Sequence, residues 1–316
     1  MGGCLKVLVN GAAGFIGSRF CDTLASRGFD VVATVRSKAT RDEIAVGDIG
    51  SETNWRRPLA TQPEVVVHLA ARVHLMKDDE SDTLEAYRAV NVEGALNFAR
   101  QAAASGVRRF VYLSSIKVNG EFTDGRQPFT EDDSPAPETH YAISKHEAEQ
   151  ALHQVAAETG MEMVIIRPPL VYGPGAKANF ESMMRWLVRG VPLPLAAVNE
   201  NRRSLVALDN LVDLMVTCLS HPAAADQTLL VSDGEDLSTA ELLNRLGLAM
   251  GHPARLFYMP LTLLRLGTHT VRKPEIYQRL SGSLQLDITK ARQLLGWIPP
   301  LSVDEGLRRA ADGFCP

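Results

Sequence analysis

Short apolar runs alternate with segments of helical periodicity along the first half of the chain. The runs predict strands at 5–9, 30–35, 45–49, 64–69, 109–114 and 163–166. Apolar residues spaced three and four positions apart predict helices at 15–27, 82–105 and 140–159. Strands that alternate with helices favour βαβ crossovers and a sheet buried on both faces. We therefore expect the α/β class with a doubly wound parallel sheet.

The pattern changes after about residue 170, where Gly173-Pro174-Gly175 interrupts it and prolines separate shorter elements. Further strands are predicted at 205–208 and 228–231, and further helices at 211–220 and 239–250. The predicted larger domain spans 1–170 and receives returning segments near 205–232. The predicted smaller C-terminal α/β lobe comprises 171–204 and 233–316.

Composition narrows the class of protein without naming it. The 316 residues include 33 Lys and Arg against 37 Asp and Glu, a net charge of −4, which argues against a protein that coats nucleic acid. The four cysteines form no CxxC pair, which is typical of reduced thiols. No apolar run approaches the roughly 20 residues of a membrane span. We expect a cytoplasmic protein that does not insert into membranes.

A glycine-rich turn, Gly11-Ala12-Ala13-Gly14-Phe15-Ile16-Gly17, follows the first predicted strand and opens a predicted helix. Gly11 permits the tight turn, Gly14 lets the backbone approach a pyrophosphate, and Gly17 lets helix and strand pack closely. Free N–H groups at the start of a helix attract a phosphate. This context predicts a Rossmann-type dinucleotide site.

The GxxGxxG spacing resembles the extended short-chain dehydrogenase/reductases of the NAD-dependent epimerase/dehydratase family, which act mostly on nucleotide-diphosphate sugars. Later segments match the same family in order, including HLAA at 68–71, YAISK at 141–145 and RPPLVYGPG at 167–175. The resemblance implies cofactor contacts at Gly11, Ala13, Gly14, Phe15, Ile16, Gly17, Asp48, Ile49, Leu69, Ala70, Ala71, Asn91, Tyr141, Lys145 and Pro168. It also implies a homodimer built on helices from 82–104 and the Tyr141 segment.

The Tyr141-x-x-x-Lys145 pair supports proton transfer on chemical grounds. A free tyrosine has a pKa near 10, and a lysine four residues on lies on the same helix face, where its charge lowers that pKa. Tyr141 is thus a candidate general acid and base beside a nicotinamide that carries hydride. We choose Ser115 over Ser114 as the residue that polarises the reacting oxygen, because Ser115 reproduces the family's spacing to Gly120.

Residues after Ser115 separate the branches of the family. Sugar 4,6-dehydratases carry Asp-Glu there, and Ile116-Lys117 cannot replace that acidic pair. The stretch SSIKVNGE resembles the bacterial UDP-sugar 4-epimerases and 4-ketoreductases of surface-polysaccharide synthesis. We therefore exclude the dehydratase branch.

The end of the second predicted strand bears on the choice of cofactor. NAD-preferring folds place an acid there for the ribose 2′-hydroxyl, whereas this chain has Val35 followed by Arg36. Arg36 suits a 2′-phosphate, which slightly favours NADP over NAD. Because a reductase consumes NADPH at each turnover, that preference favours reduction.

Basic and amide side chains of the second half provide candidates for substrate contacts. Arg203 and Asn179 match positions that contact the substrate diphosphate in the family, and Arg279 is a third candidate. Ser115 and Lys117 are candidates for contacts with the sugar. No metal ligand set is predicted, so the expected partner is a nucleotide-diphosphate sugar.

Three functions remain at this point. The first is reduction of a UDP-4-keto sugar at C4 by hydride from NAD(P)H, and the second is 4-epimerisation of a UDP-hexose such as UDP-glucose or UDP-N-acetylglucosamine with tightly bound NAD. The third is a non-catalytic, cofactor-sensing regulatory protein. Such proteins commonly lose the Tyr or Lys, and this chain keeps Ser115, Tyr141 and Lys145.

Overall fold

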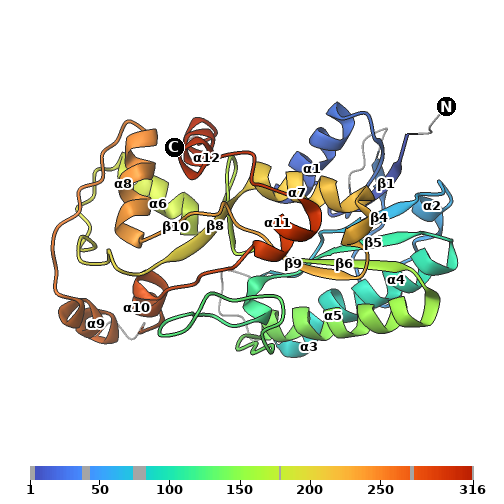
Figure 1. Cartoon of the computed structure of the whole chain (residues 1–316), viewed down its shortest axis with the longest axis horizontal. Coiled ribbons are helices and arrows are strands. Elements are labelled where there is room, and N and C mark those ends of the chain that lie inside the picture. The colour runs from blue at the N-terminus through green and yellow to red at the C-terminus, as the bar shows by residue number, and fades with distance from the viewer. Residues whose placement is uncertain (1–3, 38–42, 74–82, 178, 271–273, 315–316) are drawn as a thin grey trace.

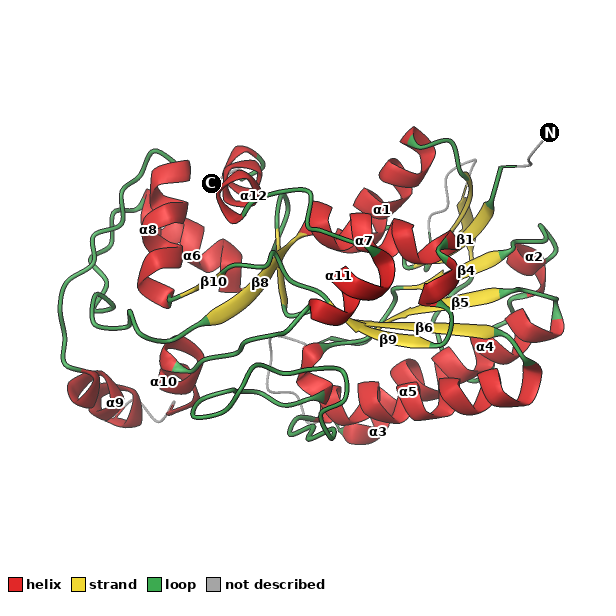
Figure 2. Cartoon of the chain, viewed as in Figure 1, coloured by secondary structure: helices red, strands yellow, loops and turns green. Residues whose placement is uncertain are grey.

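The computed structural model describes residues 4–37, 43–73, 83–177, 179–270 and 274–314. Within these ranges a seven-stranded parallel sheet forms the larger layer, with strand order β3-β2-β1-β4-β5-β6-β9 (Figure 2). Its strands are β1 (Lys6–Asn10), β2 (Asp30–Val35), β3 (Glu43–Ala45), β4 (Val65–His68), β5 (Arg109–Leu113), β6 (Glu162–Arg167) and β9 (Gln227–Leu230). The predicted doubly wound α/β fold is confirmed.

Helices cover both faces of this sheet (Figure 1). In β1, Val7 and Val9 pack in one core with α1 (Phe15–Ser26), α7 (Leu208–Ser220) and α11 (Thr289–Leu295). Leu8, between them, points to the opposite face and joins a second core. That face is covered by α2 (Arg56–Leu59), α4 (Gly94–Ala104) and α5 (His140–Thr159). The alternation of side chains along a strand explains how one apolar run serves two cores.

Two predicted elements differ in the structure. The helix predicted at 82–105 is divided into α3 (Leu84–Arg88), the π-helical turn η1 (Ala89–Glu93) and α4, while residue 82 lies outside the described residues. The strand predicted at 45–49 is wrong in its bounds, because β3 ends at Ala45. After it, Gly47 adopts φ +77°, a left-handed conformation that turns the chain away from the sheet.

The smaller lobe is built on a three-stranded mixed sheet, β10-β8-β7. Its strands are β7 (Leu170–Tyr172), β8 (Arg203–Ala207) and β10 (Asp236–Leu237). Its helices are α6 (Asn179–Val188), α8 (Thr239–Ala249), α9 (Leu261–Thr270), α10 (Pro274–Ser281) and α12 (Val303–Asp312). Short 3₁₀ turns are η2 (Ile116–Val118) and η3 (Pro222–Ala224).

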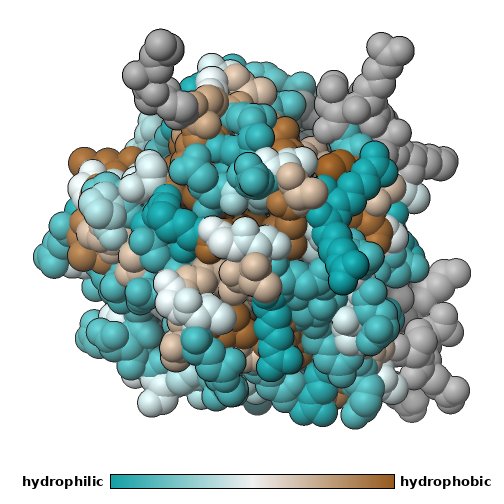
Figure 3. Space-filling view, turned by 90° about the vertical axis from the view of Figure 1, so that its right-hand side faces the viewer, coloured by the Kyte–Doolittle hydropathy of each residue, from teal (hydrophilic) through white to brown (hydrophobic). Residues whose placement is uncertain are grey.

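One segment that was predicted to belong to the smaller lobe packs against the larger unit instead. This segment contains α11. Ile288, Ala291, Leu295 and Trp297, on and beside α11, are buried in the core that contains β1 and β9. The chain therefore crosses between the two units more often than its proline pattern indicates. Figure 3 views the molecule from the end that lies at the right of Figure 1. The surface of this end is mostly hydrophilic, and polar side chains interrupt its apolar areas.

Candidate active site

The predicted site residues follow the carboxyl ends of neighbouring strands. The glycine turn follows β1, residues 69–71 follow β4, Ser115 follows β5, and Pro168 follows β6. Because the strands are parallel, these ends share one edge of the sheet, which faces the smaller lobe (Figure 2). Ligands of open α/β sheets bind at this edge.

The glycine turn is tightly enclosed by its own backbone. Gly11 adopts φ +84°, and a Cβ there would lie 2.8 Å from the backbone nitrogen of Ala70. A Cβ at Gly17 would lie 2.0 Å from the carbonyl oxygen of Gly11. A Cβ at Gly14 would meet only that same oxygen, at 3.2 Å. Gly11 and Gly17 are therefore required by packing inside the turn, whereas Gly14 leaves its outer side open.

The start of α1 fits a bound anion. Its N-cap residue, Gly14, provides no side-chain acceptor, and the first turn contains no acidic residue. The first N–H groups of a helix need acceptors, and together they carry a partial positive charge. Phe15 and Ile16 begin this helix directly after Ala13 and Gly14. The residues present therefore fit a dinucleotide whose pyrophosphate meets this helix start.

The chain after β4 is fixed by hydrogen bonds on both sides. Leu69 donates its N–H to the carbonyl of Asn10 at 3.0 Å, which places Ala70 and Ala71 beside the glycine turn. Asn91, on η1, accepts from the N–H of Arg72 at 2.8 Å and donates to its carbonyl at 3.1 Å. The same amide also donates to the Ser144 hydroxyl of α5 at 2.9 Å. Asn91 is thus buried and joins this loop to the helix that carries Tyr141.

Ser115 lies beside Tyr141, and a side-chain hydrogen bond between them acts on the tyrosine hydroxyl. Ser115 also caps η2 by accepting from the N–H of Lys117 at 3.3 Å. The neighbouring Ser114 hydroxyl is buried and has no hydrogen-bond partner in the described part of the chain. The structure therefore brings Ser115, rather than Ser114, to the tyrosine.

Lys145 is buried one helical turn after Tyr141, but it bonds to the strand rather than to the tyrosine. Its Nζ donates to the carbonyl of Leu113 at 2.8 Å and to the Tyr112 hydroxyl at 3.2 Å. Burial lowers the pKa of Lys145 to about 7, although the charge of Glu149 opposes this. The amine therefore loses its proton more readily than an ordinary lysine does.

Burial also controls Tyr141. It raises the pKa of the Tyr141 hydroxyl to about 12, and the hydrogen bond with Ser115 acts in the opposite direction. The pKa of Tyr141 is therefore raised, and not lowered by Lys145 as predicted, because desolvation outweighs the hydrogen bond with Ser115. Tyr141 is neutral here and is placed to donate a hydrogen bond or a proton.

Arg36 and Asp48, two predicted cofactor contacts, form an ion pair with each other. Both side chains are 78% exposed, at the ends of neighbouring strands β2 and β3. Val35 is buried at the end of β2, and Ile49 is partly buried just after Asp48. Asp48 thus brings a carboxylate to Arg36, the residue that follows Val35.

The predicted substrate contacts lie on both units. Lys117 donates to both carboxylate oxygens of Glu121 at 2.8 and 2.9 Å. Arg203 donates to the carbonyls of Arg279 and Gly282, each at 3.0 Å, and burial lowers its pKa. The Arg279 side chain is exposed at the end of α10, and Asn179 begins α6, although its side chain lies outside the described residues.

Two residues that contact this machinery were not among the predicted ones. Glu121 lies four positions after Lys117, a spacing typical of ion pairs on a helical turn, and could have been found from that pattern. Tyr112 is a polar-tipped residue in an apolar strand two positions before Ser114. Its role becomes visible only when the fold places it against Lys145.

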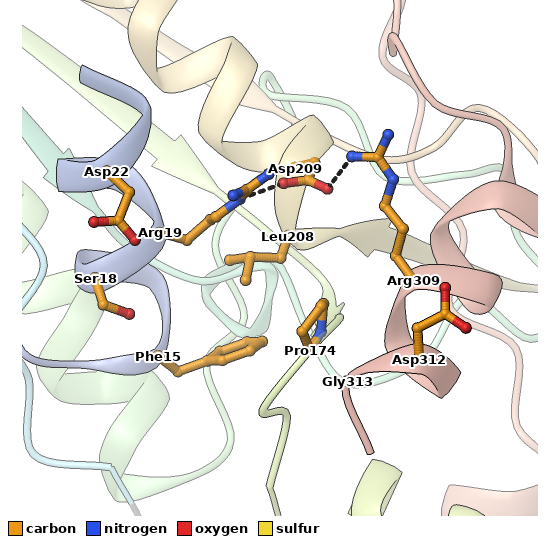
Figure 4. Close-up of a pocket in the computed structure, with 10 residues that line it drawn as sticks. All are labelled: Phe15, Ser18, Arg19, Asp22, Pro174, Leu208, Asp209, Arg309, Asp312 and Gly313. Carbon is orange, nitrogen blue, oxygen red and sulfur yellow. Dashed lines mark hydrogen bonds and ion pairs between the residues drawn. The ribbon is translucent and has the colours of Figure 1, made fainter. Parts of the chain in front are cut away.

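A separate groove of about 420 Å³ lies between α1, the start of α7 and α12 (Figure 4). Asp209 bridges the two units there, since it accepts from Arg19 at 2.6 Å and from Arg309 at 2.7 Å. The groove does not include Ser115, Tyr141 or Lys145. Its ion pairs hold the two units together beside the cofactor helix.

The described part of the chain carries neither a cluster of metal-binding side chains nor a membrane-spanning helix. No group of three or more His, Cys, Asp or Glu side chains in these ranges could hold a metal ion. Among the helices described, none combines the length and apolar character that crossing a membrane requires.

The fold and the site define the class of protein. The chain belongs to the NAD dependent epimerase/dehydratase family, whose sequence profile matches residues 7–231. It is an enzyme of this family, and its cofactor is a nicotinamide dinucleotide.

Individual proteins resemble the whole chain. It is 45% identical over 313 residues to the UDP-glucose 4-epimerase of Vibrio cholerae, covering 98% of this chain and 95% of that one. The UDP-glucuronic acid 4-epimerase of Bacillus cereus, solved with NAD, has a TM-score of 0.77 at 20% identity over 98% of both chains. RMD of Pseudomonas aeruginosa, solved with NADPH, has a TM-score of 0.75 at 21% identity over 98% of both chains.

Proposed function

We propose that the protein is a UDP-hexose 4-epimerase that keeps NAD bound through its catalytic cycle. The observation that carries this proposal is the 45% identity, over nearly the full length of both chains, to a UDP-glucose 4-epimerase. This favours the second of the three functions considered from the sequence over reduction of a 4-keto sugar. UDP-glucose is accordingly the first substrate to test.

The proposed chemistry needs a proton acceptor beside the hydroxyl on sugar C4. Bound NAD would supply a reversible hydride acceptor for C4. As a phenolate, Tyr141 would take the proton of the C4 hydroxyl and later return it, while Ser115 would hold the same sugar oxygen. The neutral tyrosine can form this phenolate only if a nearby positive charge stabilises it. Lys145, whose pKa is about 7, is the candidate cation on the same helix.

Holding NAD is proposed for the glycine turn and the start of α1, where the first N–H groups have no side-chain acceptor. The Arg36–Asp48 pair supports NAD rather than NADP. Asp48 neutralises Arg36 and is itself exposed at that position, so it would repel a ribose 2′-phosphate and suit a 2′-hydroxyl.

Binding of the nucleotide diphosphate is proposed for Arg203 and Arg279, with Asn179 from the start of α6. Support comes from the structure of this corner, where Arg203 is tied to the end of α10 through the carbonyls of Arg279 and Gly282. Lys117 is proposed to contact the sugar, for which its Nζ must give up one or both of its hydrogen bonds to Glu121. A homodimer and a cytoplasmic location remain proposals that follow from the family.

Reduction of a UDP-4-keto sugar remains the second candidate function. The observation that favours it is the pair Val35 and Arg36, because the strand end itself lacks an acid and carries a guanidinium group. A fold neighbour solved with NADPH shows only that this fold accommodates that cofactor in another protein.

Cofactor content and cofactor consumption distinguish the two candidates. Protein purified without added cofactor is denatured, and the released nucleotide is identified by mass spectrometry. In parallel, native protein is mixed with NADPH and a UDP-4-keto-6-deoxy sugar, and absorbance at the NADPH band is followed. We expect released NAD and no sustained oxidation of NADPH. Sustained stoichiometric oxidation would establish the reductase in place of the epimerase.

A further inference from the structure

Exposed apolar side chains gather at the outer end of the smaller lobe, around α9 and the turn after α6. We call them the outer apolar patch, and its members are Trp186, Val191, Phe257, Tyr258, Leu261, Leu263 and Leu266. Backbone hydrogen bonds bring its two segments together: Leu193 donates to the carbonyl of Arg255 at 2.9 Å, and Phe257 donates to the carbonyl of Leu193 at 3.0 Å. These bonds hold the segment after α6 beside the segment that leads into α9.

Helix α9 is apolar on more than the side that it buries. Leu264 packs into the lobe's small core with Leu193 and Leu243. Leu263, next to it, is 55% exposed, and Tyr258 in the preceding segment is 73% exposed. A surface helix of a monomer normally presents polar residues on its outer face, and a contiguous exposed apolar area indicates an interaction surface.

Positive charge accompanies the patch. The described residues 251–270 and 274–280 contain three basic residues and one acidic residue, a net charge of +2 in a chain whose total is −4. The basic residues are Arg255, Arg265 and Arg279, and the acidic residue is Glu275. Arg255 lies over Gly190 in the turn after α6, beside Val191, and its side chain is exposed. The partner is therefore expected to be both apolar and anionic.

We propose that the outer apolar patch docks on the surface of a membrane that contains anionic lipids. Leucines would enter the boundary between headgroups and acyl chains, the three aromatic residues would lie at the headgroup level, and Arg255 would meet lipid phosphates. Helix α9 has 10 residues, which suits a helix that lies on a membrane rather than one that crosses it. The opposite end of the molecule is mostly hydrophilic, so contact through α9 leaves that end in water (Figures 1 and 3).

Docking at this end leaves the site accessible to substrate. Ser115, Tyr141 and Lys145 lie at the edge of the seven-stranded sheet and are not part of the patch. Helix α10, which packs against α9, ends at the segment that Arg203 holds. The membrane would therefore approach the lobe proposed to bind the nucleotide diphosphate while the catalytic residues keep their positions.

Cosedimentation with lipid vesicles tests this proposal on the full chain. Vesicles of phosphatidylcholine with phosphatidylglycerol are compared with vesicles of phosphatidylcholine alone, at low and high salt. The test variant is Tyr258→Ser with Leu263→Ser. The matched control is Leu248→Ser with Ile298→Ser, two residues that are 71% and 72% exposed outside the patch. Circular dichroism confirms that each variant is folded.

We expect the wild type and the control to sediment with anionic vesicles at low salt and to be released by high salt. The binding of the test variant to anionic vesicles should be weaker by roughly fivefold or more, since the variant loses apolar contact with the headgroup boundary. Equal binding of the test variant and the wild type would overturn the proposal, as would absence of wild-type binding. A patch-dependent shift to dimers in solution, without vesicle binding, would assign the surface to a second copy of the chain and overturn the proposal as well.

Discussion

The hydroxyl of Tyr141 is the atom on which the proposed chemistry depends, and its surroundings act on it in opposite directions. Burial raises its pKa to about 12, while the hydrogen bond with Ser115 lowers it. Lys145 is buried nearby with a pKa of about 7 and donates to Leu113 and Tyr112. A neutral tyrosine beside a readily titrated amine is suited to passing one proton in either direction.

Tyr141→Phe removes the proposed acid and base without changing the ring. We expect turnover of UDP-glucose to fall about 10²-fold or more, while bound NAD is retained because the glycine turn is intact. Turnover and cofactor content are measured on the same preparation. Tyr258→Phe, at an exposed position outside the site, is the matched control. Unchanged turnover in Tyr141→Phe would contradict the catalytic role and favour the cofactor-sensing function.

The buried His68 makes the free energy of unfolding depend on pH. Burial lowers the pKa of His68 to about 3, so the folded protein keeps this imidazole neutral. The unfolded chain takes up a proton near pH 6.5, so folding stability is lost as pH falls from 6.5 toward 3, by about 1.4 kcal/mol per pH unit. The buried Asn10 amide donates to its Nδ1 at 2.7 Å and favours the same neutral form.

Urea unfolding at pH 7 and pH 5 measures this effect in the wild type and in His68→Gln. We expect the loss of unfolding free energy between the two pH values to be smaller in the variant, since glutamine does not titrate. The comparison uses only the pH-dependent difference, so a general loss of stability in the variant does not affect it. An equal loss in both proteins would show that His68 does not contribute.

At the scale of elements, the strongest constraint is the contact between the glycine turn and α1. Gly17→Ala would place a Cβ 2.0 Å from the carbonyl of Gly11. We expect a loss of about 2 kcal/mol or more in unfolding free energy, because the turn must shift, together with loss of bound cofactor. Urea unfolding and the cofactor content of the purified protein measure the two effects.

Gly267→Ala is the control, because a Cβ at this helical position has no atom within 4 Å. Alanine is a better helix former than glycine, so this variant should be neutral or more stable by up to about 1 kcal/mol. If Gly17→Ala behaved like Gly267→Ala, close packing at the turn would not be the reason for glycine there.

Periodicity predicted most elements, because burial on two faces leaves a clear apolar pattern. It did not predict η1, because a π-helical turn differs from an α-helix by its hydrogen bonds and leaves the apolar spacing nearly unchanged. The end of β3 was also missed, since Gly47 turns the chain while the apolar residues continue to Ile49. The pairing of Asp48 with Arg36, and of Tyr112 with Lys145, becomes visible only when the fold brings separate elements together.

At the scale of the molecule, Asp233 joins elements of both units. Its carboxylate accepts from the Tyr172 hydroxyl of β7 at 2.7 Å, from the N–H of Ala207 in β8 at 2.8 Å, and from Asn210 of α7 at 2.7 Å. The group is buried, so its removal leaves several buried donors without this partner. The sequence showed that the chain returns between units but not which residue holds the crossing.

Asp233→Ala should therefore lower the unfolding free energy by about 3 kcal/mol, and Asp233→Asn should lower it less, since the amide keeps one acceptor oxygen. Urea unfolding followed by fluorescence and by circular dichroism measures both variants. We expect the two signals to separate in Asp233→Ala, because the units then unfold less cooperatively. Wild-type stability in Asp233→Ala would contradict this role.

The most direct test of the central claim is proton NMR of UDP-glucose incubated with purified, dialysed protein and no added cofactor. The account predicts that the anomeric signal of UDP-galactose appears and grows to a constant ratio with UDP-glucose, since the bound NAD is reused in every cycle. A spectrum in which UDP-glucose stays unchanged, from protein shown to contain NAD, would contradict UDP-glucose 4-epimerisation.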